Sequence, residues 1–175
     1  MKTIEGFQGA AFGLADGVIC IFGMIVGVAV ATNDVQFIFI AAVTGGIADA
    51  LGNAFGFYLS ELTERGTQIY ERSRGKNVTA HTMREVLLSG MLSFAATIFV
   101  LAMLLLPFLI TGIQTALVIS SVEAIVSLFL LGFYVGKLSS ENPVSTGMRY
   151  VVLGVIGGVL SYLVGGVLKG LILGL

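Results

Sequence analysis

Acidic side chains inside apolar stretches are the residues of this 175-residue sequence best placed to do chemistry. One, Asp16, lies in the run GLADGVICIFGMIVG, and the others are Asp49 and Glu123. A carboxylate near the middle of a membrane helix costs about 2.5 to 3.5 kcal/mol on insertion scales, so each is a functional-site hypothesis. Such groups bind cations through oxygen or take up protons.

Helical spacing gives these acids neighbours with other donor atoms. Asp16, Cys20 and Met24 fall on one helix face, because residues four and eight apart lie almost above one another. Asp49 and Asn53 share a face for the same reason. Oxygen ligands alone suit Mn²⁺, Mg²⁺ or Ca²⁺, whereas sulfur from Cys20, Met24 or Met91 would bring Fe²⁺ and other softer divalent ions within reach.

Composition places these residues in a membrane. The chain is 57% hydrophobic and 11% charged, and its mean hydropathy is +1.02. Its apolar runs exceed the roughly 20 residues that span a bilayer core. The sequence predicts an all-α integral membrane protein with a single membrane domain, whose spans are expected at about 7–31, 36–60, 83–106, 110–136 and 148–172.

The three intramembrane acids have no counter-charge in the sequence, since no Lys, Arg or His occupies the middle of an expected span. Left alone in lipid they would cost about 9 kcal/mol, comparable with a whole domain's stability. One interpretation is that each acid is protonated and hydrogen-bonded to a neighbouring helix. Glu123 also shares its helix face with Ser120 and Ser127, which offer hydroxyl groups. For the three acids together, a path for cations or protons is the better explanation.

Basic residues predict the orientation. Eight of the nine Lys and Arg residues fall on one side of the expected spans, and only Lys169 falls on the other. The positive-inside rule therefore predicts a cytoplasmic N-terminus, a cytoplasmic connection at 61–82 and an outside C-terminus. Because the chain is short and shows no eukaryotic sorting features, we expect a prokaryotic plasma membrane.

The connections carry their own signals. The second span is expected to continue as a helix beyond the membrane to Gly75, and Thr82 to Glu85 has the capping-box pattern that starts the third. Pro107 is expected in the turn between the third and fourth spans, and Pro143 in the connection before the fifth. The 24 glycines include rows at spacing four, which predict close helix contacts: Gly9, Gly13 and Gly17; Gly52 and Gly56; Gly154 and Gly158.

Acids also occur where the second helix leaves the membrane. Glu61 and Glu64 are expected to gather cations at a pore mouth. The alternative is a solvated helix face in which acids pair with Arg residues four positions away. His81 is interpreted as a solvated loop residue rather than a ligand.

These patterns resemble the vacuolar iron transporters and their yeast calcium-cross-complementer relatives. The resemblance rests on GLADG at 13–17 opening the first span, GFYLS at 56–60 closing the second, and STGMRYVVLGVIGGVLSYLVG at 145–165 in the fifth. It covers nearly the whole chain.

The resemblance implies a homodimer of five-helix subunits, with a path between the subunits lined by the first two helices. It also implies export of Fe²⁺ or Mn²⁺ from the cytosol in exchange for protons, with Asp16 at the family's intramembrane aspartate position. Asn53 stands where the family has the methionine of a Ser-Met pair, and Phe57 where it has the Glu of Gly-Glu-Tyr. The Glu-rich cytoplasmic segment is shortened to about 22 residues. Asp49 is expected to compensate as a harder oxygen ligand.

We therefore expect a divalent metal transporter, a metal/proton antiporter rather than an enzyme. Asp16 would be the central ligand and proton acceptor. Asp49 and Asn53 would complete the site, with Met24 as a softer ligand, and Glu123 would be a separate proton site or a packing residue. The expected partners are membrane lipid, a second copy of the chain, divalent metal ions and protons. We expect no nucleic acid and no cofactor beyond the transported metal.

Two other classes are possible from sequence. A membrane scaffold or accessory subunit could retain this fold without the site, which would explain the missing methionine and the short cytoplasmic segment. An intramembrane aspartyl protease would also use paired acids. Its Gly-x-Gly-Asp motif is incomplete here, because the sequence before Asp49 is Gly46-Ile47-Ala48.

Overall fold

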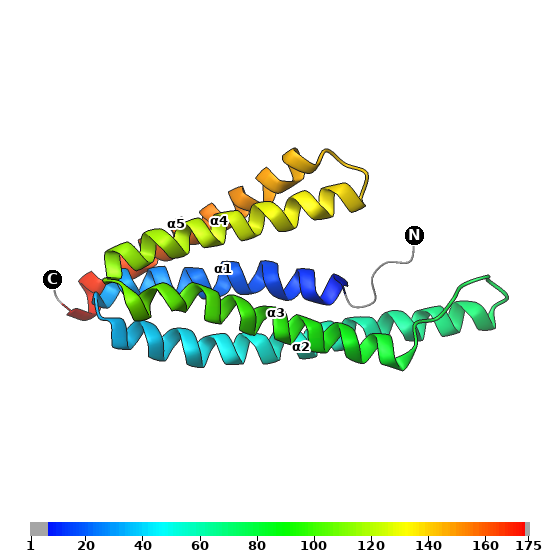
Figure 1. The fold of residues 1–175 in the computed structure, drawn as a ribbon. Helices are drawn as coiled ribbons and strands as arrows, with labels where there is room; N and C mark the ends of the chain where they lie inside the picture. Colours follow the sequence, from blue (N-terminus) through cyan, green and yellow to red (C-terminus); the bar gives the residue numbers. More distant parts are fainter. Residues whose placement is uncertain (1–6, 174–175) are drawn as a thin grey trace.

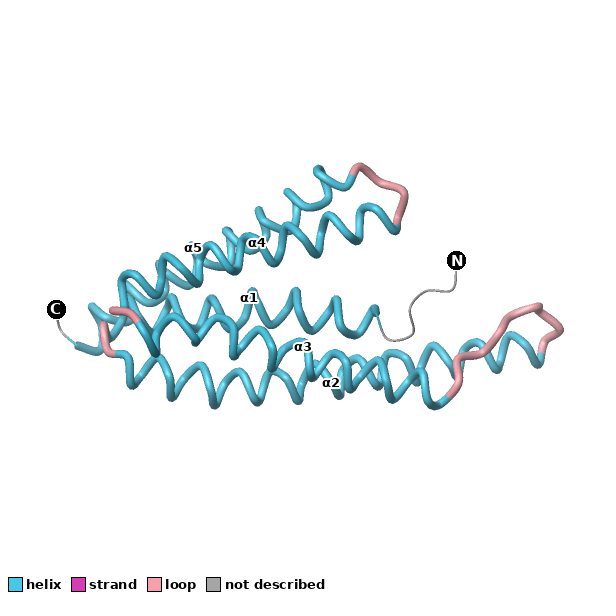
Figure 2. Tube along the Cα trace, viewed as in Figure 1, coloured by secondary structure: helices cyan, strands magenta, loops and turns pink. Residues whose placement is uncertain are grey.

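The computed structural model describes residues 7–173, which form five helices joined by short connections (Figures 1 and 2). Each helix is long and apolar enough to cross a membrane, and residues 7–173 contain no strand. The predicted all-α membrane fold is therefore confirmed. The helices are α1 (Phe7–Thr32), α2 (Val35–Ser73), α3 (Met83–Ile110), α4 (Ile113–Leu138) and α5 (Pro143–Leu173).

Helix α1 is the centre of the bundle. It packs against each of the other four helices, with the α2–α3 pair on one side and the α4–α5 pair on the other (Figure 1). Ile21 and Ile25 on α1 are fully buried, as is Leu104 on α3. A residue on α1 can therefore contact several helices, which makes this helix the natural support for a site.

The contact between α1 and α3 is close enough to require glycine. A Cβ atom added at Gly9 or Gly13 would collide with the backbone carbonyl oxygen of Ser89 or Ser93, respectively. At Gly17 the added atom would lie 3.2 Å from a side-chain carbon of Thr97. Small residues allow this approach in lipid, where no hydrophobic drive brings helices together. The predicted role of this glycine row is confirmed.

The other two glycine rows differ from each other. Around Gly52 and Gly56 on α2, nothing among the described residues comes within 4 Å of an added Cβ atom, so this row is open in the single chain. On α5, a Cβ atom at Gly154 would collide with Leu128 of α4, and one at Gly158 would lie 3.1 Å from Phe22 of α1. Within one subunit, the prediction of close contact is thus wrong for α2 and right for α5.

Helix α2 continues to Ser73 without a break, as predicted, and extends beyond the rest of the bundle (Figure 1). The chain then turns back to α3, which begins with the predicted capping box. Thr82 Oγ accepts a hydrogen bond from the Glu85 N–H at 3.2 Å, and a Glu85 carboxylate oxygen accepts one from the Thr82 N–H at 2.6 Å. This cap fixes where α3 begins.

Both proline predictions are wrong. Pro107 lies inside α3, and the turn follows at Thr111, whose N–H and hydroxyl both donate to the Pro107 carbonyl at 3.0 and 2.9 Å. Pro107 lacks the N–H that would bond to the Met103 carbonyl, and such a loss is tolerated in transmembrane helices because neighbouring groups and local adjustments compensate for it. Pro143 is the first residue of α5, a position that suits its fixed φ, and Asn142 caps two N–H groups of the first turn at 3.1 and 3.2 Å.

Candidate metal site

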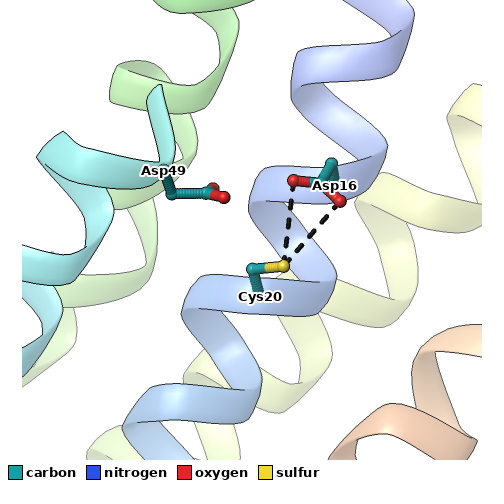
Figure 3. A group of neighbouring side chains, drawn as sticks. All are labelled: Asp16, Cys20 and Asp49. Atoms are coloured by element: carbon teal, nitrogen blue, oxygen red, sulfur yellow. Dashed lines mark hydrogen bonds between the residues drawn. The ribbon is translucent and has the colours of Figure 1, made fainter. Parts of the chain in front are cut away.

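Three potential ligands from α1 and α2 meet inside the predicted membrane region. Asp16 and Cys20 lie on successive turns of α1, and the Asp49 carboxylate points toward them from α2 (Figure 3). Cys20 Sγ lies 3.8 Å from both Asp16 carboxylate oxygens, and one ligand atom from each of the three residues lies within 4.8 Å of the others. In the single subunit the two acids are half-buried and Cys20 is exposed.

Asn53 links the two acids. Its side-chain nitrogen donates to Asp16 Oδ2 at 3.0 Å and lies 3.4 Å from Asp49 Oδ2. The residue is buried, with 8% of its surface exposed. The structure therefore brings together Asp16, Asp49 and Asn53, the three residues assigned from sequence to the core of the site.

Thr97 of α3 is a fourth polar contact, which the sequence reasoning missed. Its hydroxyl lies 3.2 Å from the Asn53 nitrogen and within reach of two backbone carbonyls, those of Gly13 at 3.0 Å and Ser93 at 3.1 Å. The sequence did contain a signal for this contact, because Ser89, Ser93 and Thr97 repeat at the same spacing of four as the glycines of α1. In the structure the two rows lie against each other.

Apolar contacts flank the cluster along α1. Beyond Cys20, the thioether of Met24 points at Gly45 of α2, where it leaves no room for a Cβ atom. On the other side, the rings of Phe12 and Phe57 lie with their centroids 5.6 Å apart. Phe57 stands at the position where the resembled family has Glu, so an aromatic contact replaces a potential ligand there.

Glu123 is not part of this cluster. One of its carboxylate oxygens, Oε2, is buried without a hydrogen-bond partner in the part of the chain that the structure describes. The serines on its face bond elsewhere, because Ser120 donates to the Leu104 carbonyl at 2.8 Å and Ser127 Oγ lies 3.8 Å from Met103 Sδ. The structure therefore gives Glu123 neither of the serine hydrogen bonds that its helix face suggested.

A second group of potential ligands lies at the start of the α2 extension. Glu61, Glu64 and His81 each place one ligand atom within 4.8 Å of the others, and His81 Nδ1 lies 2.9 Å from a carboxylate oxygen of Glu61. The returning chain is held there by two hydrogen bonds: the His81 N–H donates to Gln68 at 2.8 Å, and Arg65 Nε donates to the His81 carbonyl at 3.0 Å.

His81 lies in the connection between α2 and α3, as predicted, but it is not merely solvated, because its ring contacts Glu61. Its side chain is 35% exposed and that of Glu61 only 6%. The chain doubles back after α2, and this brings together residues that are 20 positions apart. Nothing in the local sequence marks such a contact.

The two groups differ in chemistry. Two carboxylates with a thiol can bind a divalent cation of intermediate softness, and two carboxylates with an imidazole suit ions such as Fe²⁺, Mn²⁺ or Zn²⁺. Each group supplies three protein ligands, fewer than the roughly four to six that such cations commonly take, so water or further protein ligands would have to complete the shell.

Comparison with known proteins gives the same assignment as the sequence patterns. A model of the VIT family matches residues 7–88 and 75–166. An uncharacterized protein from Methanocaldococcus jannaschii is 27% identical over 177 residues, covering 94% of this chain and 92% of the relative. The matched residues contain both ligand groups and four of the helices in full. The chain therefore belongs to the VIT family, the family of vacuolar iron transporters, whose members transport metal ions.

Proposed function

We propose that this protein transports a divalent metal cation, Fe²⁺ or Mn²⁺, out of the cytosol in exchange for protons. The observation that carries the proposal is the pair Asp16 and Asp49, which face each other across α1 and α2 with Cys20 beside them. Two carboxylates so close together repel each other, and no basic side chain lies in the middle of a described helix to offset that repulsion. A divalent cation would supply the missing charge.

Asp16 is the central ligand and the proton acceptor in this proposal. Metal and proton would compete for the same carboxylate, because a carboxylate must be deprotonated to bind a metal ion. Asp49 supplies the second oxygen ligand, and Cys20 supplies sulfur at 3.8 Å from Asp16. Met24 would be a further soft ligand farther along α1. Asp16, Asp49 and Cys20 would then be sufficient for the exchange of one cation for protons at this site.

A homodimer with the ion path between its subunits follows from how much of the site one subunit leaves uncovered. Cys20 is exposed and the two acids are only half-buried, although charged groups facing lipid are costly. Gly52 and Gly56, on the same helix as Asp49, have open space around an added Cβ atom as far as residues 7–173 show, and would let a second α2 approach closely. A second copy over this face would remove the acids from lipid.

The group formed by Glu61, Glu64 and His81 would receive the cation on the cytosolic side. This assignment depends on the orientation predicted by the basic residues, with the N-terminus in the cytosol and the C-terminus outside a prokaryotic plasma membrane. An imidazole ligand favours transition metals over Ca²⁺ and Mg²⁺, so this group would select before the cation reaches Asp16. Glu123, which lies apart from both groups, is a candidate for a separate proton site.

The test is transport by the purified protein in liposomes that contain a pH-sensitive dye. Uptake of Fe²⁺ under anaerobic conditions, Mn²⁺ and Ca²⁺ would be compared in wild type, Asp16→Asn and Asp34→Asn. Asp34 is the matched control, since it caps α2 outside both ligand groups and asparagine caps equally well. We expect metal flux with an opposing pH change in wild type and Asp34→Asn, and neither in Asp16→Asn. A folded wild-type dimer that moves no ion would favour a scaffold or accessory subunit instead.

A further inference from the structure

We infer that Thr97 of α3 is a positioning residue of the proposed metal site, which fixes how the Asn53 amide faces the two carboxylates. Held by Thr97, the amide turns its NH₂ group toward the acids, sharing its two hydrogens among three acceptors, and its oxygen is not a metal ligand. The third helix would thereby influence which metal the first two helices bind. This inference rests on the proposed function and adds a determinant of metal preference to it.

The orientation follows from counting hydrogens on Thr97. A hydroxyl has one hydrogen to donate, and the carbonyl oxygens of Gly13 and Ser93, at 3.0 and 3.1 Å, can only accept. Thr97 is fully buried, and in the structure its hydrogen is directed to one of these two carbonyls. The hydroxyl therefore presents a lone pair to Asn53, and the NH₂ side of the amide, at 3.2 Å, is the side that can satisfy it.

The same NH₂ group faces both acids, at 3.0 Å from Asp16 Oδ2 and 3.4 Å from Asp49 Oδ2. Turning the Asn53 amide over would place its carbonyl oxygen against three other acceptors and would remove their donor. Each buried acceptor that loses its donor shifts the equilibrium between the two amide orientations by about tenfold. Asn53 therefore faces the two carboxylates with its NH₂ group. Its carbonyl oxygen points away from them and cannot bind a cation that lies between them.

A specific ligand set follows. With the amide held away, the cation is left with two carboxylates and the Cys20 thiolate, a mixed set that includes one soft ligand. Without the Thr97 hydroxyl, one of the three acceptors that favour this amide orientation is lost. With a cation bound to the carboxylates, the Asn53 amide would then turn more easily and offer its carbonyl oxygen, a ligand that hard cations such as Mn²⁺ prefer. Loss of the hydroxyl should therefore shift metal preference from softer toward harder ions.

The experiment measures the binding of Co²⁺, an air-stable substitute for Fe²⁺, and of Mn²⁺ to the full chain in detergent by isothermal titration calorimetry. The variants are Thr97→Val, which removes the hydroxyl at nearly constant volume, and Thr97→Ser, which keeps it. Ser93→Ala is the matched control, because the Ser93 side chain is fully buried one turn away and its hydroxyl has no partner among the described residues.

We expect Thr97→Val to shift the ratio of the two dissociation constants toward Mn²⁺ by about fivefold to tenfold, the effect of one lost buried hydrogen bond. Thr97→Ser and Ser93→Ala should leave this ratio within about twofold of wild type. A purely structural role would reduce the number of binding sites but not alter the ratio. An unchanged ratio in Thr97→Val, or an equal shift in Ser93→Ala, would overturn the inference.

Asn53→Leu provides a second reading that does not depend on whether Thr97→Val folds. If the amide only positions the acids, its loss should weaken Co²⁺ and Mn²⁺ binding by the same factor. If its oxygen binds metal, Mn²⁺ binding should weaken more, and the inference fails. Wild-type protein that binds neither metal would overturn the proposed function itself, which is a distinct result from an unchanged metal ratio.

Discussion

Gly13→Ala should destabilise the bundle by about 1 to 3 kcal/mol, because it places a methyl group where two backbones touch. The new Cβ atom would overlap the backbone carbonyl of Ser93, which cannot turn aside as a side chain can, so α1 and α3 would have to separate. Separation would also stretch the 3.0 Å hydrogen bond from Thr97 to the Gly13 carbonyl, at a cost of about 1 kcal/mol. The better helix propensity of alanine offsets about 1 kcal/mol, which leaves the overlap as the net effect.

Two further glycines make this prediction a graded series. At Gly17 the added atom would lie 3.2 Å from the Thr97 side chain, so a shift of a few tenths of an ångström suffices and we expect a smaller loss than at Gly13. At Gly66, on the α2 extension, no atom of another described residue lies within 4 Å of the added Cβ, and alanine should stabilise the helix by up to about 1 kcal/mol.

The assay is titration of the detergent-solubilised protein with SDS, followed by far-ultraviolet circular dichroism. The free energy of unfolding should fall in the order Gly66→Ala, wild type, Gly17→Ala, Gly13→Ala. Metal binding to Gly13→Ala should weaken in parallel, since the Thr97 contact moves with α3. A Gly13→Ala protein as stable as Gly66→Ala would refute the close packing of α1 and α3.

Three other substitutions test the ligand groups and the cap. Asp49→Asn should weaken Mn²⁺ binding at least about tenfold in calorimetry, because it removes a charged ligand, and unchanged affinity would remove Asp49 from the site. His81→Ala should abolish binding at the α2 extension but leave the other site intact, so two remaining binding events would contradict the assignment. Thr82→Ala should cost about 1 kcal/mol and speed amide hydrogen exchange in the first turn of α3 about fivefold, whereas equal exchange would show that the cap is dispensable.

The features that could be predicted from sequence depend on residues close together in the chain. The length of the apolar runs predicted the five helices, and the pattern from Thr82 to Glu85 predicted the start of α3. The absence of proline predicted that α2 continues beyond the bundle, where it ends at Ser73. The shared face of Asp49 and Asn53 follows in the same way from a spacing of four. Each of these needs only the geometry of a single helix.

The features that were missed depend on how separate helices are rotated against one another. Thr97 is one hydroxyl in an apolar span, and its partners Asn53 and Gly13 lie 44 and 84 positions away. His81 is brought to Glu61 by a chain reversal that the local sequence does not encode. Pro107 was placed in a turn because proline breaks helices in water, whereas near a helix end in a membrane it is tolerated.

The candidate site also helps to hold the bundle together. One amide, that of Asn53 on α2, bonds to Asp16 on α1 and to Thr97 on α3, so a single side chain joins three helices. Interhelical hydrogen bonds in membranes contribute about 0.6 to 2 kcal/mol each, which matters where lipid provides no hydrophobic drive for association. The glycines at 13 and 17 bring α3 close enough for Thr97 to take part. Close packing and ligand geometry are therefore set by the same contacts. A substitution at Gly13 should also weaken metal binding at Asp16.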